Sequence, residues 1–107
     1  MKIKFRKAKL EDAQLYFNWA NDKIVRQNSF NTSEIGYELH VKWFTAKLNS
    51  PDCFFYLFTD ENDEPIGQVR IDKTNEEIVI GISIDEKQRG KGFGVSMLNQ
   101  ATEDYLK

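Results

Sequence analysis

The stretch "DEKQRGKGFGVSML" (Asp85–Leu98) joins a strand pattern to a helix pattern through a glycine-rich loop. Its three glycines stand at positions 90, 92 and 94, and Arg89 and Lys91 lie among them. Glycine lets the backbone turn sharply and lets a ligand approach its N–H groups closely. The first turn of a helix adds unpaired N–H groups and a partial positive charge. The stretch therefore predicts a site for a phosphate group.

Two common phosphate-binding motifs do not match this loop. A P-loop requires G-x-x-x-x-G-K-[ST], which the chain lacks. The dinucleotide fingerprint G-x-G-x-x-G also fails, because the glycines run G-x-G-x-G, and the short tail has no room for the acidic ribose partner. The motif that the sequence does contain is R-G-K-G-F-G at Arg89–Gly94, preceded by Gln88.

Residue periodicity outside the loop predicts an α+β fold. Alternating or continuous apolar runs predict strands over residues 2–8, 53–60, 66–72 and 77–85. Helical spacing predicts helices over residues 10–21, 37–48 and 92–105, with Gly36 as an N-cap. The order β-α-α-β-β-β-α indicates a mostly antiparallel sheet in one domain, residues 1–107.

Composition excludes several classes of protein. The net charge of -2 gives no general attraction to nucleic acid or to an anionic membrane. The chain has one cysteine, Cys53, and one histidine, His40, so we expect no disulfide framework and no metal site. No apolar run approaches the length of about 20 residues that spans a bilayer. We therefore expect a cytoplasmic protein with a local anion site.

The loop and its neighbours resemble the GNAT acetyltransferase superfamily. R-G-K-G-F-G is similar to the loop that holds the pyrophosphate of acetyl-CoA in that family, and the resemblance covers nearly the whole chain. The segments "NWAND", "VRQNSFN", "H..WF" and "IGQVRID" are most similar to domains that acetylate nucleotide-linked amino sugars in bacterial surface-polysaccharide pathways. The resemblance implies an acetyl-CoA-dependent N-acetyltransferase with a small-molecule primary amine as acceptor, favoured to be an amino-sugar nucleotide.

The same resemblance implies where acetyl-CoA binds. The backbone at the end of the last strand would hold the acetyl carbonyl and the pantetheine arm, and the loop amides would hold the pyrophosphate. The expected contacts are Ile82, Ser83, Ile84, Gln88, Arg89, Gly90, Lys91, Gly92, Phe93 and Gly94. No metal is expected in the reaction.

The general base stays open among four candidates. They are His40, Glu77, Ser83 (acting through a water molecule) and Asp85. A histidine with its ordinary pKa near 6.5 suits proton removal at neutral pH. The structural alternatives are a packed or surface position for His40 and solvated strand ends for the two carboxylates.

Five residues are candidates for binding the acceptor. Trp19 and Trp43 offer aromatic faces, for which core packing is the alternative. Arg26, Ser29 and Asn31 offer polar groups, for which a capped loop is the alternative.

The chain stops earlier than the resemblance implies. Domains of this family continue past the helix that follows the loop, whereas the sequence stops at Lys107. We therefore expect a C-terminally truncated domain, or a homodimer in which another copy completes the sheet. The alternatives are a catalytically silent CoA-binding or assembly module, an acetyltransferase for protein N-termini or amino acids, and an unrelated phosphate-loop domain.

Overall fold

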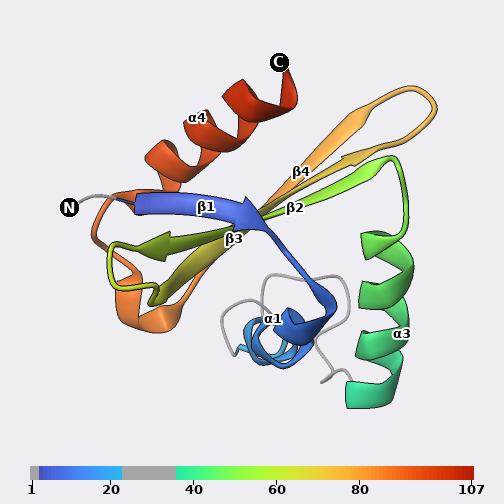
Figure 1. Cartoon of the computed structure of the whole chain (residues 1–107), viewed down its shortest axis with the longest axis horizontal. Coiled ribbons are helices and arrows are strands. Elements are labelled where there is room, and N and C mark those ends of the chain that lie inside the picture. Colours follow the sequence, from blue (N-terminus) through green and yellow to red (C-terminus); the bar gives the residue numbers. More distant parts are fainter. Residues whose placement is uncertain (1–2, 23–35) are drawn as a thin grey trace. The chain divides into compact units, whose positions relative to one another are not determined.

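The computed structural model describes residues 3–22 and 36–107 (Figure 1). Its elements are β1 (Ile3–Lys7), α1 (Ala13–Ala20), α3 (Tyr37–Leu48), β2 (Cys53–Asp60), β3 (Pro65–Lys73), β4 (Ile78–Ile84) and α4 (Phe93–Tyr105), with 3₁₀ turns at Leu10–Asp12 and Glu86–Gln88. The predicted α+β class and element order are confirmed. Each predicted helix and strand ends within about three residues of its observed bounds.

The four strands form one antiparallel sheet in the order β1-β2-β3-β4. The strands follow one another in the chain from β2 to β4, so short hairpins suffice to connect them. A register shift falls between Phe58 and Thr59 on β2. A glycine inside a strand often marks a bulge or a close backbone approach, but at Gly81 the pairing of β3 with β4 is regular. The close approach occurs at Gly67, where an added Cβ would meet the carbonyl oxygen of Ser83.

The main hydrophobic core lies between α4 and one face of this sheet (Figure 1). From the helix, Met97 and Ala101 are fully buried, while Leu98 remains 37% exposed. Of these two neighbouring residues, Met97 is therefore the one that points into the core. The fully buried sheet residues of this core are Tyr56, Phe58, Ile66, Val69 and Ile71. The hydrophobic area that they remove from water stabilises the unit formed by β1–β4 and α4.

Helices α1 and α3 form a second compact unit, over residues 9–51. Its aromatic rings pack closely: Tyr16 on α1 lies 4.8 Å from Phe44 on α3, centroid to centroid. Gly36 is the N-cap of α3, as predicted. On α3 the buried stripe contains His40 and Phe44, whereas Leu39 is 70% exposed. The helix therefore buries the stripe that carries the only histidine of the chain.

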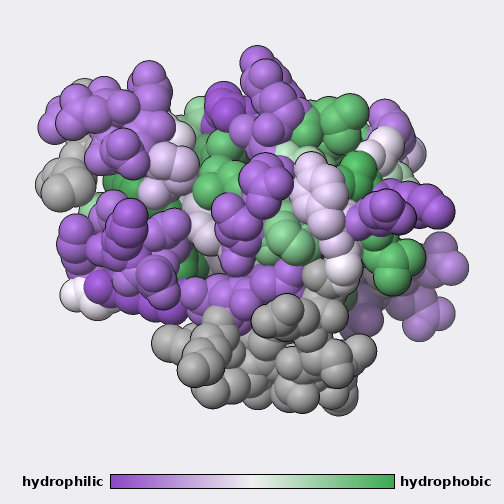
Figure 2. Space-filling model, turned by 90° about the horizontal axis from the view of Figure 1, so that it is seen from below, coloured by the Kyte–Doolittle hydropathy of each residue, from purple (hydrophilic) through white to green (hydrophobic). Residues whose placement is uncertain are grey.

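Large hydrophobic side chains also reach the surface. Figure 2 shows one face, on which hydrophobic groups are interspersed with hydrophilic ones. On β4, Ile78, Val79, Ile80 and Ile82 are each between 42% and 52% exposed. Among the described strands, β4 pairs only with β3. None of the described helices has the length and apolar character to cross a membrane.

Candidate functional site

The glycine-rich loop joins β4 to α4 through two left-handed residues. Gly90 has φ +80° and Gly92 has φ +78°. Gly92 is the N-cap of α4, so its conformation sets where the helix begins. A Cβ added at either position would meet nothing within 4 Å. Glycine is therefore required there by backbone conformation, and the space beside the loop is open to a ligand.

The next two residues attach the helix start to the end of β4. The Phe93 side chain is 8% exposed and belongs to the core, so only its backbone can face a ligand at the loop. A Cβ added at Gly94 would lie 3.5 Å from Cδ1 of Ile84 and 3.9 Å from Cδ1 of Ile82. This contact places the first turn of α4 against the last residues of β4. The predicted strand-end and loop residues are therefore brought together.

Polar contacts hold the loop between strand and helix. Lys91 Nζ donates to Oε1 of Gln88 over 3.1 Å. Asp85 Oδ1 accepts from the backbone N–H of Lys87 at 3.0 Å, and the Asp85 carbonyl accepts from Gln88 N–H at 2.8 Å. The Asp85 N–H itself donates to the Ile66 carbonyl at 2.8 Å. Asp85 therefore shapes the turn between β4 and the loop, and its role as a base stays a prediction.

Ser83 has a partner that the sequence analysis did not identify. Its Oγ accepts from Nε2 of Gln68 on β3 over 3.2 Å. Oε1 of Gln68 is buried and has no hydrogen-bond partner among the described residues. The two residues are direct partners in the β3–β4 register. Only this register reveals the pair, because 15 positions separate the residues in the chain.

Glu77 lies away from the loop. It stands in the turn before β4, where its carbonyl accepts from the backbone N–H of Thr74 at 2.9 Å. Ser83 is six residues further along the strand, which corresponds to about 20 Å at the usual rise. The structure therefore does not bring Glu77 together with Ser83 and Asp85.

His40 is buried in the unit formed by α1 and α3, with an exposed fraction of 3%. Its ring stacks on Phe44 at 10° between planes and lies 5.6 Å from Phe17. Burial lowers the pKa of His40, and a hydrogen bond to the Ala13 backbone opposes this shift. The imidazole is therefore neutral at pH 7.

The two tryptophans differ in exposure. Trp19 is 7% exposed and packs against Tyr16, so core packing accounts for it. Trp43 is 39% exposed and lines a pocket of about 320 Å³ with Ala20, Leu39 and His40. Of the predicted acceptor residues, Arg26, Ser29 and Asn31 lie outside the described residues.

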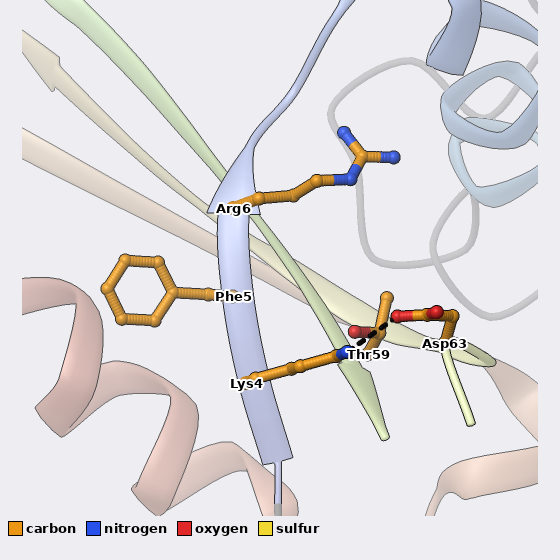
Figure 3. Close-up of a pocket in the computed structure, with 5 residues that line it drawn as sticks. All are labelled: Lys4, Phe5, Arg6, Thr59 and Asp63. Atoms are coloured by element: carbon orange, nitrogen blue, oxygen red, sulfur yellow. Dashed lines mark ion pairs between the residues drawn. The ribbon is translucent and has the colours of Figure 1, made fainter. Parts of the chain in front are cut away.

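A second hollow of about 430 Å³ lies beside β1 (Figure 3). Lys4 and Arg6 point to one side of β1 and Phe5 to the other. Lys4 Nζ forms an ion pair with Asp63 Oδ1 at 2.7 Å, and this lysine holds the pKa of Asp63 below its usual range. Both side chains of the pair are more than half exposed, so the pair contributes little to stability. Over residues 3–22 and 36–107, no three His, Cys, Asp or Glu residues are grouped as a metal site would require.

Comparison with known proteins identifies the architecture. A model of the GNAT acetyltransferase domain matches residues 2–107. None of the curated proteins compared matches the chain.

Solved structures share the fold at low sequence identity. A spermidine N-acetyltransferase from Vibrio cholerae, in complex with CoA and spermine, has a TM-score of 0.83 and 17% identity, covering 94% of this chain and 62% of that one. A possible acetyltransferase from Clostridium difficile 630 has a TM-score of 0.77 and 16% identity, covering 96% and 70%. An F149G mutant of the Vibrio enzyme has a TM-score of 0.76 and 17% identity, covering 94% and 60%. The chain thus spans about three fifths of the length of the Vibrio enzyme.

Proposed function

The chain belongs to the GNAT acetyltransferase family, and from that premise we propose that it transfers the acetyl group of acetyl-CoA to a primary amine. The observation that carries the proposal is the loop between β4 and α4. Its two left-handed glycines, Gly90 and Gly92, leave open space beside the helix start. Arg89 and Lys91 add positive charge to the same loop. Such a loop fits a pyrophosphate.

The loop and the end of β4 would bind different parts of acetyl-CoA. The backbone N–H groups of residues 89–94 would hold the pyrophosphate, as expected from the sequence. The backbone of Ile82–Ile84 would hold the pantetheine arm and the acetyl carbonyl. Fixed N–H donors stabilise the negative charge that develops on that carbonyl oxygen. In the transfer, a C–N bond forms, the C–S bond breaks and the thiolate takes up the proton that the nitrogen loses.

The proposal names the acceptor only as a primary amine, because the loop would bind acetyl-CoA and gives no information about the acceptor. The amino-sugar nucleotide expected from the sequence has no support in the comparisons. One solved structure of the same fold contains spermine, which makes an aliphatic amine the other acceptor class to test. His40 and Ser83 remain proposed candidates for handling the amine proton. A cytoplasmic location and a homodimer remain predictions.

Calorimetry with acetyl-CoA tests the donor half of this proposal. We expect binding that Arg89→Glu weakens at least tenfold, because the substitution places a negative charge beside the pyrophosphate. Lys73→Glu is the matched control, since it makes the same charge change on an exposed residue at the far end of β3. Equal losses in both variants, or no binding by the wild-type chain at millimolar ligand, would exclude the loop as the site.

Release of free CoA thiol in the presence of amines tests the transfer itself. We expect release with at least one amine from a panel of an amino-sugar nucleotide, a polyamine and an amino acid. Binding of acetyl-CoA without release by any amine would instead indicate a catalytically silent CoA-binding module. The panel also determines which acceptor class the chain uses.

A further inference from the structure

The start of β3 holds the end of β4, and it does so through a bulge followed by a glycine. Phe58 of β2 pairs with Gly67, whereas the next residue of β2 pairs with Pro65. Ile66 is therefore an extra residue on β3, and such a bulge redirects the strand that carries it. The carbonyl of Ile66 accepts from the N–H of Asp85 at 2.8 Å. The extra residue thus fixes the backbone immediately after β4.

Gly67 allows the last residues of β4 to lie close to β3. A Cβ at this position would overlap the carbonyl oxygen of Ser83 and would lie 3.1 Å from Cα of Ile84. Both of these atoms belong to the backbone, so they cannot rotate away as the end of a side chain would. Glycine is therefore required at position 67 for the observed placement of Ser83 and Ile84.

The hydrogen bonds at the two ends of the β3–β4 pair show which residues of β4 face away from β3. The N–H of Thr74 donates to the Glu77 carbonyl at 2.9 Å, and the N–H of Asp85 donates to β3 at 2.8 Å. The register between these bonds is regular, and alternate residues of an antiparallel strand direct their N–H and C=O groups to the same side. The odd-numbered residues of β4 therefore face β3, while Ile82 and Ile84 face away. Among the described strands, none pairs with β4 on that side.

We propose that Gly67 is a positioning residue for the acetyl-CoA site. Because it has no side chain, the end of β4 lies against β3, and the backbone groups of Ile82 and Ile84 are directed toward the edge where the pantetheine arm binds. The proposal rests on the acetyltransferase function proposed above and assigns a role to a residue outside the glycine-rich loop. Gly67 acts through the backbone of β4 and does not itself contact the ligand.

A side chain at position 67 would displace the end of β4 toward the ligand. The Ser83 carbonyl faces β3, so relief of the overlap moves β4 away from β3. The first turn of α4 limits movement in another direction, because a Cβ at Gly94 would lie 3.5 Å from Cδ1 of Ile84. Misplacement of a positioned group by about 1 Å can cost about 100-fold in rate. Binding of the pantetheine arm should therefore depend on Gly67.

Amide hydrogen exchange in the wild-type protein tests this arrangement without a substitution. In the free protein we expect the amides of Ile82 and Ile84 to exchange faster than those of Gly81 and Ser83, which face β3. Saturating acetyl-CoA should slow exchange at Ile82 and Ile84 at least tenfold. ADP carries a diphosphate without the pantetheine arm and should leave both rates unchanged. Binding of acetyl-CoA without slower exchange at these two amides, or equal slowing by ADP, would overturn the proposal.

The nuclear Overhauser effect between the α protons of Gly67 and Ile84 tests whether the strands stay together in the complex. These residues are register partners at a position that is not hydrogen-bonded, where the α carbons of antiparallel strands come closest. We expect the cross-peak in the free protein and the same intensity at saturating acetyl-CoA. Loss of the cross-peak on binding would show that the ligand requires β4 to move away from β3, which contradicts the proposed role.

Gly67→Ala should weaken acetyl-CoA binding at least tenfold in calorimetry and leave ADP binding nearly unchanged, because the end of β4 shifts at the pantetheine arm. Gly81→Ala is the matched control, since its Cβ would lie 3.7 Å from the Arg70 side chain, an ordinary contact. This control should bind both ligands as the wild type does. Unchanged acetyl-CoA affinity in folded Gly67→Ala, or equal losses for the two ligands, would exclude the positioning role.

Thiol release separates this proposal from the proposed function. Gly67→Ala should raise KM for acetyl-CoA at least tenfold and leave KM for the amine unchanged. If the wild type transfers acetyl and the variant keeps its KM for acetyl-CoA, the function stands and the role of Gly67 fails. If the wild type binds acetyl-CoA with slower exchange at Ile82 and Ile84 but releases no thiol with any amine, the transfer function fails and the role of Gly67 in binding stands. If the wild type does not bind acetyl-CoA, both fail.

Discussion

The phenol of Tyr56 on β2 donates a hydrogen bond to Oδ2 of Asp104 on α4, with 3.0 Å between the oxygens. Lys7 Nζ lies 3.5 Å from the same carboxylate oxygen and 3.9 Å from the centre of the Tyr56 ring. The hydrogen bond from Tyr56, with a smaller contribution from Lys7, holds the pKa of Asp104 below its usual range. Burial and the contact with Asp104 raise the pKa of Tyr56. These contacts fasten the last turn of α4 to β1 and β2.

Tyr56→Phe should lower the free energy of unfolding by about 1 kcal/mol, because it removes one hydrogen bond and keeps the buried ring. Urea denaturation measures the change. Tyr105→Phe is the control: the Tyr105 ring lies 5.3 Å from Phe54, and no hydrogen bond of its hydroxyl is found among the described residues. Equal stability of the Tyr56 variant and the wild type would show that the contact with Asp104 does not stabilise the fold.

Gly67→Ala should destabilise the protein by about 1–3 kcal/mol, because overpacking at a fixed backbone forces strands apart. The added Cβ would meet the backbone carbonyl of Ser83, which cannot move without breaking the β3–β4 pairing. Gly81→Ala is the matched control on β4, since its Cβ would lie 3.7 Å from the Arg70 side chain, an ordinary contact. Thermal unfolding of the two variants compares them. A smaller decrease in melting temperature for Gly67→Ala than for Gly81→Ala would contradict the observed close approach.

Gly92→Ala should cost about 1–2 kcal/mol, the usual penalty for a left-handed residue that bears a Cβ. It should also weaken acetyl-CoA binding, since relieving the strain changes the direction of the loop N–H groups. Gly94→Ala, two residues further into α4, should be neutral or stabilising, because alanine is a better helix former than glycine. Chemical denaturation and calorimetry follow the two effects. The expectation fails if both variants lose the same stability.

Stability should fall as the pH drops below 6.5, the ordinary pKa of histidine, because burial lowers the pKa of His40 in the folded state. Between the two pKa values the unfolded chain binds a proton that the folded chain does not, so lower pH favours unfolding. One proton contributes at most about 1.4 kcal/mol per pH unit over that window.

Urea denaturation at pH 7.5 and 5.5 measures this effect. In His40→Phe the histidine contribution disappears, so the variant should lose less stability between the two pH values than the wild type. Parallel losses in the two proteins would mean that His40 does not cause the pH dependence.

Local sequence patterns were sufficient to predict the helices, the strands and the glycine-rich loop. The helix over Tyr37–Leu48 was predicted at its observed bounds, because apolar spacing and the Gly36 N-cap are properties of neighbouring residues. The glycines at 90 and 92 likewise indicated a sharply turning backbone, and both have positive φ angles. These features depend on residues within about one helical turn of each other.

Tertiary structure decided the features that join distant segments. The sequence alone does not show which of the two tryptophans is buried. In the structure, Trp19 is buried by packing, whereas Trp43 lines a pocket. The Gln68–Ser83 hydrogen bond follows from strand register, which is set by the whole face of the sheet. The hydrogen bond from the His40 ring to the Ala13 backbone joins α3 to α1, and it too follows from packing rather than from local sequence. Packing and hydrogen-bond partners between such segments have no local sequence signal, so only the folded chain could show them.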